Sequence, residues 1–116
     1  MRISDNATVE RILKAVADPE NMQLMMSIRK ESKPAQVLSA ETGIPLSTVY
    51  RKLDDLKEAG LVMTEHFIVQ SGKKVDFIIT TFSEIKTVIE ADKVAVEMVP
   101  STTSANVRWL SLFRGD

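Results

Sequence analysis

The chain has 116 residues, of which 44% are hydrophobic and 27% charged, with a formal net charge of −1 and no cysteine. This composition is typical of one globular domain with a modest core, and the lack of cysteine excludes disulfides, zinc–thiolate sites and cysteine redox switches. No apolar run reaches the roughly 20 residues of a membrane span, and no signal peptide follows Met1, so we expect a cytoplasmic protein with no membrane partner. The charge balance by itself does not favour a nucleic-acid partner.

The N-terminal part of the sequence has the periodicity of two helices. The first is expected over residues 6–17, where helical spacing aligns Val9, Ile12, Leu13 and Val16. Asp18 is a good N-cap and Pro19 suits the first helical position, so a second helix is expected from there to about Lys30. Methionine fills irregular gaps in cores. We therefore expect the second helix to bury Met22, Met25, Met26 and Ile28.

Two further helices are predicted on either side of a short turn. Ser32 is the expected N-cap of a short helix with Pro34 in its first turn, and Gly43 ends it. After the turn at residues 42–45, another helix is expected over about 46–59, closing at Gly60. Two helices joined by a short turn that contains glycine form a helix-turn-helix.

Beyond Gly60 the apolar period changes from that of a helix to that of a strand. Residues 61–70 predict one strand, residues 71–74 a turn, and residues 75–81 its partner strand. A helix-turn-helix followed by a β-hairpin is a winged helix. The predicted fold class is therefore α+β, a helical bundle with a β-hairpin wing.

Residues 82–116 predict an additional hairpin and a terminal helix. Ser83 could cap a helix, but the alternation of Ile85, Thr87 and Ile89, followed by that of 94–98, favours strands. The predicted terminal helix contains Val107, Trp109, Leu110, Leu112 and Phe113. Because these side chains cover more of a helix than one packing stripe, we expect them to hold a homodimer. The alternative is that the helix caps the monomer's own sheet. We expect residues 1–81 to form the DNA-binding domain and residues 82–116 its dimerisation extension.

The helix predicted over 46–59 has two chemically different faces. A packing stripe is formed by Val49, Leu53 and Leu56. The opposite side begins with Ser47 and Arg51, flanked by Thr48 and Tyr50. Short hydroxyls and a guanidinium near the N-terminus of a helix suit contacts with phosphates and base edges in a DNA groove. The alternative is a solvated helix with an ion pair between Arg51 and Asp55.

Two stretches of the sequence resemble a known family. LKAVADPENMQLMMSI (residues 13–28) is similar to the opening of the ArsR-type winged-helix repressors, and VLSAETGIPLSTVYRKLDDLKEAGLV (residues 37–62) to their recognition motif. The resemblance implies a sequence-specific DNA-binding transcriptional regulator, with the recognition helix of about 46–59 in the major groove and the wing at 70–75 on the backbone. The residues that it places on DNA are Ser47, Thr48, Tyr50, Arg51, Lys52, Lys73 and Lys74.

The sequence departs from this family in its metal ligands. The metal-sensing members use cysteines, and here His66 is the only histidine, so we expect neither a metal nor a cofactor, and any small-molecule effector is unknown. Residues 82–116 resemble the tails of archaeal regulators of this kind. No nucleophile–base set or glycine-rich phosphate loop is present, which argues against an enzyme. The alternative function is a winged-helix protein–protein interaction module of a transcription complex without direct base readout.

Overall fold

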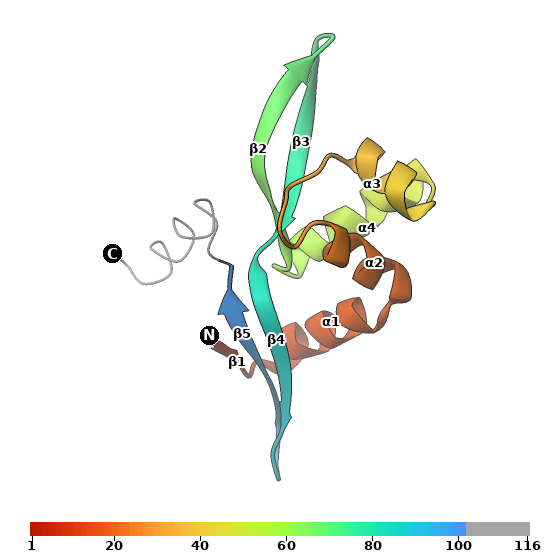
Figure 1. The fold of residues 1–116 in the computed structure, drawn as a ribbon. Coiled ribbons are helices and arrows are strands. Elements are labelled where there is room, and N and C mark those ends of the chain that lie inside the picture. The colour runs from red at the N-terminus through yellow and green to blue at the C-terminus, as the bar shows by residue number, and fades with distance from the viewer. Residues whose placement is uncertain (102–116) are drawn as a thin grey trace, which may run out of the picture.

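The computed structural model of the chain describes residues 1–101. The helices in this part are α1 (Asn6–Ala17), α2 (Pro19–Ser27), α3 (Ala35–Thr42) and α4 (Leu46–Glu58). The strands are β1 (Arg2–Ile3), β2 (Val62–Gln70), β3 (Lys73–Thr80), β4 (Phe82–Ile89) and β5 (Val94–Pro100). Figure 1 shows the helices gathered on one side of the strands, with the β2–β3 hairpin extending away from them. The predicted winged helix-turn-helix is confirmed, together with the additional hairpin; the predicted terminal helix lies outside the described residues.

Helices α1 and α2 begin at aspartates, as the sequence predicts. A carboxylate oxygen of Asp5 accepts a hydrogen bond from the backbone N–H of Thr8 at 2.9 Å. At the corner between the helices, Asp18 Oδ1 accepts from the backbone N–H groups of Glu20 and Asn21, at 2.9 and 3.1 Å. These bonds satisfy amides that have no partner inside their own helix, so each aspartate fixes where its helix starts.

Helix α2 is shorter than predicted and buries a different set of side chains. It ends at Ser27, and its core positions are Leu24 and Met25, followed by Ile28. Met22 and Met26 were expected in the core, but they are 41% and 57% exposed. The burial prediction was wrong for these two because the inward face of α2 follows the spacing of residues 21, 24, 25 and 28, and one short helix cannot bury every methionine it carries.

The start of α3 also differs from the prediction. Pro34 occupies the N-cap position, and Ser32 Oγ instead donates a hydrogen bond to the carboxylate of Glu65 at 2.9 Å. The backbone of Lys33 pairs with Ile78 as an isolated β-bridge. A residue before proline favours extended backbone, which suits this bridge and delays the helix to Ala35.

The turn between α3 and α4 is held by side-chain hydrogen bonds. Gly43 ends α3 in the left-handed conformation, with φ of +77°. Thr42 Oγ1 accepts from the backbone N–H of Ile44 at 3.2 Å, and Ser39 Oγ donates to the carbonyl oxygen of Ile44 at 2.6 Å. The Ile44 side chain is 4% exposed. These contacts fix the angle at which α4 leaves the turn.

Strands β2 and β3 form a two-stranded antiparallel sheet, which we call the wing. Its register runs from Val62 opposite Thr80 to Gln70 opposite Lys73, with an irregularity between Thr64 and His66. The turn has only two residues, Ser71 and Gly72, with φ of 53° and 76°. Two successive positive φ values are typical of the type I′ turn that joins tight hairpins. The predicted turn of four residues was therefore too long, since β3 begins at Lys73.

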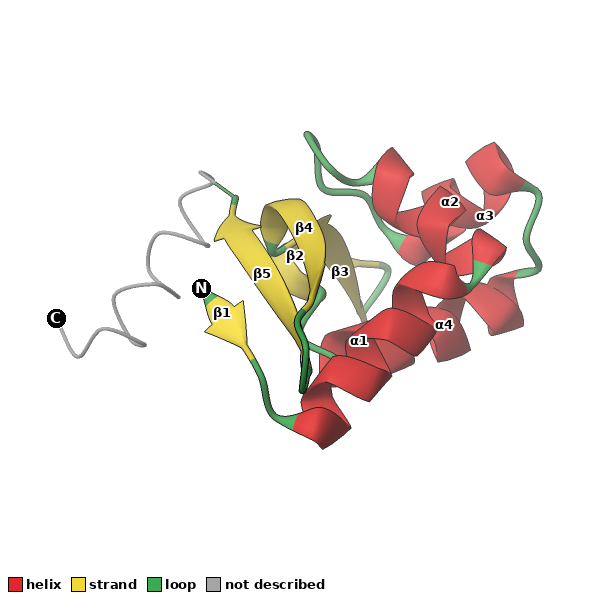
Figure 2. Ribbon diagram, turned by 90° about the horizontal axis from the view of Figure 1, so that it is seen from below, coloured by secondary structure: helices red, strands yellow, loops and turns green. Residues whose placement is uncertain are grey.

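The second sheet has the order β1–β5–β4. Strand β1 was not predicted; it pairs Ile3 with Val96 of β5. Val96 and Met98 belong to the same hydrophobic core as residues of the helices, including Val9 and Ile12. Figure 2 shows this sheet beside α1. The described part of the predicted extension therefore shares one core with the helices, while the division at residues 81 and 82 stays a prediction.

Candidate nucleic-acid interface

The inward face of α4 is fixed by the core. Val49, Leu53 and Leu56 are each no more than 3% exposed, as the packing stripe predicts. The same face also takes in residue 52, since positions 49, 52, 53 and 56 follow one helical stripe. The residues that start the opposite face, Ser47 and Arg51, are therefore directed to solvent, and both are exposed.

The flanks of the outward face differ from each other. Tyr50 is 47% exposed, and its hydroxyl accepts a hydrogen bond from Gln36 Nε2 of α3 at 3.2 Å. Thr48 is half-buried. Gln36 thus positions the tyrosine ring across the helix-turn-helix. Sequence reasoning missed Gln36 because its partner lies 14 residues further along the chain.

Arg51 is exposed, and within residues 1–101 its side chain makes no hydrogen bond or ion pair. In particular, no ion pair joins it to Asp55 in this part of the chain. The alternative prediction, a solvated helix with an Arg51–Asp55 ion pair, is therefore not what the structure contains. An unpartnered guanidinium on an exposed helix face can donate two parallel hydrogen bonds to a phosphate or to a guanine base.

The N-terminus of α4 adds backbone donors beside these side chains. The N-cap is Pro45, which makes no side-chain cap hydrogen bond, and no acidic residue lies in the first turn. The first N–H groups of a helix carry the positive end of its dipole. The N-terminal half of α4 is therefore suited to an anion, whereas Asp54, Asp55 and Glu58 make its C-terminal half acidic.

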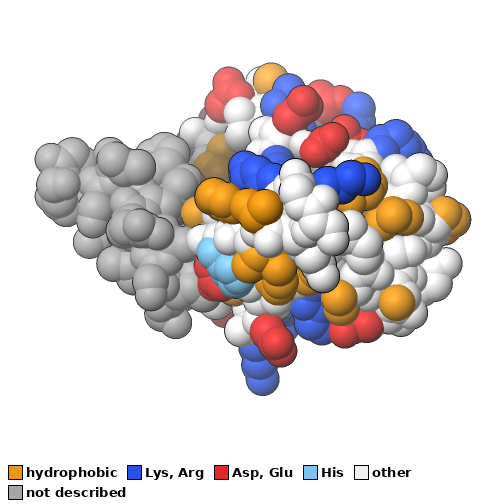
Figure 3. Space-filling model, turned by 90° about the horizontal axis from the view of Figure 1, so that it is seen from above, with side chains coloured by type: hydrophobic (Ala, Val, Ile, Leu, Met, Phe, Trp, Pro, Cys, Tyr) orange, Lys and Arg blue, Asp and Glu red, His pale blue; other side chains and the backbone are white. Residues whose placement is uncertain are grey.

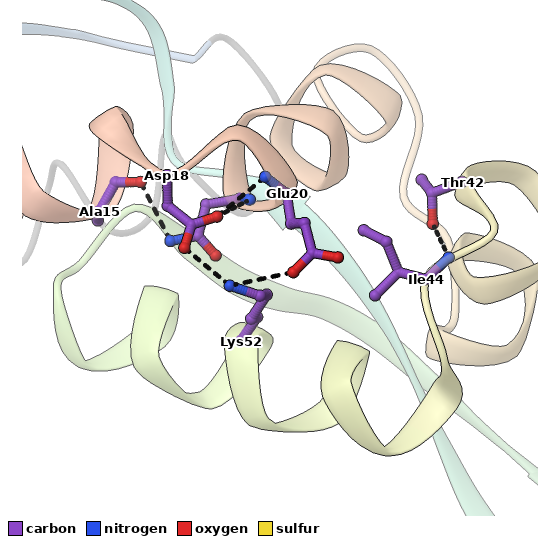
Figure 4. Close-up of polar contacts among 7 residues, drawn as sticks. Ala15, Asp18, Glu20, Thr42, Ile44 and Lys52 are labelled. Carbon is purple, nitrogen blue, oxygen red and sulfur yellow. Dashed lines mark hydrogen bonds and ion pairs between the residues drawn. The ribbon is translucent and has the colours of Figure 1, made fainter.

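Lys52 has a different environment from the one that the resemblance implies. It is 8% exposed, and its Nζ lies 2.9 Å from Asp18 Oδ2 and 3.6 Å from Glu20 Oε1. Figure 4 shows this lysine reaching the α1–α2 corner. The hydrogen bond from Lys52, followed by that from the Asn21 backbone, lowers the pKa of the Asp18 carboxyl. Lys52 therefore joins α4 to the corner between α1 and α2. It does not belong to the candidate interface.

The wing carries the other two predicted cations. Lys73 and Lys74 are both exposed, at the start of β3. Lys74 Nζ lies 4.9 Å from the centre of the Phe67 ring and 3.5 Å from Asp76 Oδ1. Figure 3, which looks onto the wing from above, shows cationic and apolar side chains next to each other on this face. The wing thus presents Lys74 over an aromatic ring and not on a purely polar loop.

A hollow of about 160 Å³ lies between α4 and the wing. Tyr50 and Lys57 line it from α4, and Lys74 from β3, so two of the predicted residues face the same space. The acidic side chains of Asp54 and Asp76 border it as well. The two predicted contact regions therefore adjoin, with mixed charge between them.

His66 is exposed, and its ring stacks on Phe77 with centroids 4.5 Å apart. Its Nδ1 lies 3.2 Å from Glu65 Oε1. Within residues 1–101, no group of three or more His, Cys, Asp or Glu side chains could hold a metal ion. In the same residues, no helix combines the length and the apolar character that crossing a bilayer requires. The predicted dimerisation residues 107–113 lie outside the described part.

No protein-family model matches the sequence, and no curated protein matches it. Solved structures do. The chain is similar to NolR from Sinorhizobium fredii, with 16% identity over 94% of this chain and 83% of that chain, at a TM-score of 0.46. It is similar to the homodimeric winged helix-turn-helix DNA-binding domain of Mb0332 from Mycobacterium bovis, with 17% identity over 94% and 77%, at a TM-score of 0.47.

A third similar structure is an ArsR family transcriptional regulator. Its identity to this chain is 12%, over 97% of this chain and 93% of the other, at a TM-score of 0.48.

Proposed function

We propose that the chain is a DNA-binding transcriptional regulator, with α4 in the major groove and the wing on the phosphate backbone. The observation that carries the proposal is the exposed, unpartnered side chain of Arg51. It is exposed on the outward face of α4 and has no partner within residues 1–101. Ser47 and Tyr50 lie on the same side of the helix, and lysines of the adjoining wing extend the cationic surface.

The proposal assigns a role to each part of the interface. Arg51 reads a base or clamps a phosphate through its two parallel donors, while Ser47, Thr48 and Tyr50 bond phosphate or base edges. Lys73 and Lys74 contact phosphates without reading sequence. The acidic C-terminal half of α4 lies clear of the DNA, because recognition helices contact bases mainly through their N-terminal residues.

We test the proposal with Arg51→Ala. Binding to a duplex enriched from a random library is measured by fluorescence anisotropy at low and at high salt. We expect an unchanged fold and a loss of about 1–3 kcal/mol in binding free energy. Arg11→Ala is the matched control, since Arg11 is also exposed but lies beside the C-terminal end of α4, where its Nη1 is 3.5 Å from the carbonyl oxygen of Glu58. If neither wild type nor control binds DNA in a salt-dependent way, the protein-interaction module replaces this proposal.

We also propose that the regulator is a homodimer. Two-fold dimers place their recognition helices about 34–36 Å apart, one DNA turn, which lengthens the sequence that is read. Val107, Trp109, Leu110, Leu112 and Phe113 are the proposed contacts. Light scattering of the full chain and of a chain truncated after Ser101 tests this assignment. A folded monomer after truncation supports it; a truncated dimer would move the interface elsewhere, and an unfolded chain would favour the capping role.

A further inference from the structure

An apolar hollow of about 300 Å³ lies between α2 and β4, on a part of the molecule that the proposed DNA interface does not use. Six of its lining side chains are apolar: Val16, Met22, Met25, Met26, Phe82 and Ile85. Met25 forms the floor at 2% exposure, whereas Met22 and Met26 are 41% and 57% exposed. Its volume and lining are those of a small-molecule site, because such sites are mainly apolar with a few polar groups.

The hollow continues into a cationic one. Met26 and Arg29 line both, and the second hollow, of about 460 Å³, is also bordered by Lys30 and Lys33. Lys33 is already paired with Glu41, at 2.8 Å. Lys30 has no hydrogen bond or ion pair within residues 1–101. One acid, Glu31, also lines the second hollow, against the three cations Arg29, Lys30 and Lys33. The two hollows together form a trough, apolar at one end and with an excess of cations at the other.

Two charged groups on the wall of the apolar hollow, Arg29 and Glu84, each have a partner in the structure. Arg29 Nη2 donates to the carbonyl oxygen of Ser83 at 3.1 Å, which holds the guanidinium at the junction of the two hollows. On β4, the carboxylate of Glu84 is paired with Lys86 at 3.1 Å. The acid on the β4 wall is thus paired with its own neighbour, and at the other end the cations still outnumber Glu31.

We propose that this trough binds a small amphipathic carboxylate, with its apolar body on the methionines and its carboxylate at Arg29 and Lys30. Methionine side chains adapt to apolar ligands of varied shape, and a guanidinium matches a carboxylate geometrically. The proposal deepens the proposed function by naming the chemical class of an effector. It rests on that function only for the effect on DNA, since binding itself is measured without DNA.

The backbone links this trough to the wing. Beyond Arg29, the backbone of Lys33 exchanges hydrogen bonds with Ile78 of β3, at 3.0 and 2.9 Å. The backbone N–H of Thr80, at the end of β3, donates to the carbonyl oxygen of Ile28 at 3.2 Å. A ligand that moves Arg29 therefore acts on the segment bonded to the base of the wing, and we expect it to change DNA affinity severalfold.

The binding test uses sodium decanoate and the full chain with ¹³C-labelled methionine methyl groups. The chain has six methionines, so Met1, Met63 and Met98 serve as internal controls outside the trough. We expect saturable shifts at Met22, Met25 and Met26. Equal shifts at all six, no shifts, or shifts that appear only once decanoate forms micelles would overturn the site. Partition into phosphatidylcholine vesicles without decanoate would point to a membrane surface and equally overturn it.

Arg29→Gln tests the cationic end. We expect it to weaken decanoate binding about tenfold, the loss of one contact between charged groups, while 1-decanol binding is unchanged. Arg11→Gln is the matched control, because its guanidinium also bonds a backbone carbonyl, that of Glu58, away from the trough. If decanoate and decanol bind alike and Arg29→Gln alters neither, the carboxylate assignment is wrong. Decanoate binding that leaves DNA affinity unchanged would refute only the effector role.

Discussion

The chain has two β-hairpins of similar length that have opposite relations to the core. The wing is a sheet of only two strands, held at its base by the bridge from Lys33 to Ile78. Near its tip, Phe67, Ile68 and Val69 are 55%, 43% and 68% exposed. The second hairpin is joined by β1 into a three-stranded sheet, and its Val96 and Met98 are buried at 0% and 3%.

This difference separates side chains that serve folding from side chains that are available to a partner. A hairpin of two strands is marginal by itself, and it persists when its base is held by a larger structure. The base of the wing is buried at Val62, Ile78 and Ile79, whereas its tip is not. We therefore expect changes at the wing tip to alter DNA binding but not stability, and changes in the second hairpin to do the reverse.

The largest expected effect is on the free energy of unfolding, which substitutions in the two hairpins should change to different extents. Met98→Ala removes a buried side chain and leaves a cavity, so we expect it to lower the free energy of unfolding by about 2–5 kcal/mol. Val69→Ala, at the exposed tip, should change it by no more than about 0.5 kcal/mol. Urea unfolding followed by circular dichroism measures both. Equal losses would show that the wing tip is packed against a surface and contributes to stability as the second hairpin does.

Two lysines extend the comparison to the helical bundle. Lys52→Met keeps the buried stem but removes the cation beside Asp18, and we expect a loss of about 1–2 kcal/mol, less than for a fully buried pair because the Asp18 side chain is 36% exposed. Lys73→Met should be close to neutral in the same urea experiment. A neutral Lys52→Met would mean that its ion pair contributes nothing to the packing of α4.

The contact between Lys52 and Asp18 should also make the free energy of unfolding depend on pH. The pKa of Asp18 lies below its ordinary value of 3.8, chiefly because of the hydrogen bond from Lys52. A lowered pKa in the folded state contributes stability above the ordinary value, and this is lost as the pH falls through the folded pKa. We expect the stability gap between wild type and Asp18→Asn to narrow between about pH 5 and about pH 3. Asparagine keeps an N-cap acceptor, so a gap that stays constant would mean that the charge of the Asp18 carboxylate contributes no pH-dependent stability.

The smallest change should appear only in salt dependence. Replacing Lys73 and Lys74 by glutamine should reduce the slope of log affinity against log salt by up to about 1.8, since each phosphate contact releases counterions. The control pair on the second hairpin is Lys86→Gln with Lys93→Gln, which should leave the slope unchanged. An altered base preference at constant slope would instead mean that the wing reads sequence.

The elements with regular local patterns could be predicted from the sequence. Helix α1 has its predicted bounds, and both hairpins follow the period of two. Strand β1 has only two residues, so it carries no period, and its pairing with β5 depends on chain more than 90 residues away. The start of α3 was mispredicted because the β-bridge of Lys33 to Ile78 overrides the capping tendency of Ser32.

In the candidate site, the outward position of Arg51 could be predicted, whereas the partner of Lys52 could not. The helical stripe of positions 49, 52, 53 and 56 was a signal that Lys52 faces inward. A lysine on that stripe still has to find a carboxylate, and Asp18 lies 34 residues earlier in the chain. Local patterns thus indicate which way a side chain points, while its charge partner is decided by how the helices pack.

The tight turn at Ser71 and Gly72 means that the length of the wing can change only in steps of one residue pair. Because the base of the hairpin is anchored, adding one residue to each strand would move the turn outward by about 3.4 Å, and adding one residue to a single strand would force a bulge. Each added pair would also carry its side chains to the opposite face from the pair before it. Homologous wings of this build should therefore differ by even numbers of residues, each pair resetting both the reach of the lysines and the side on which they project.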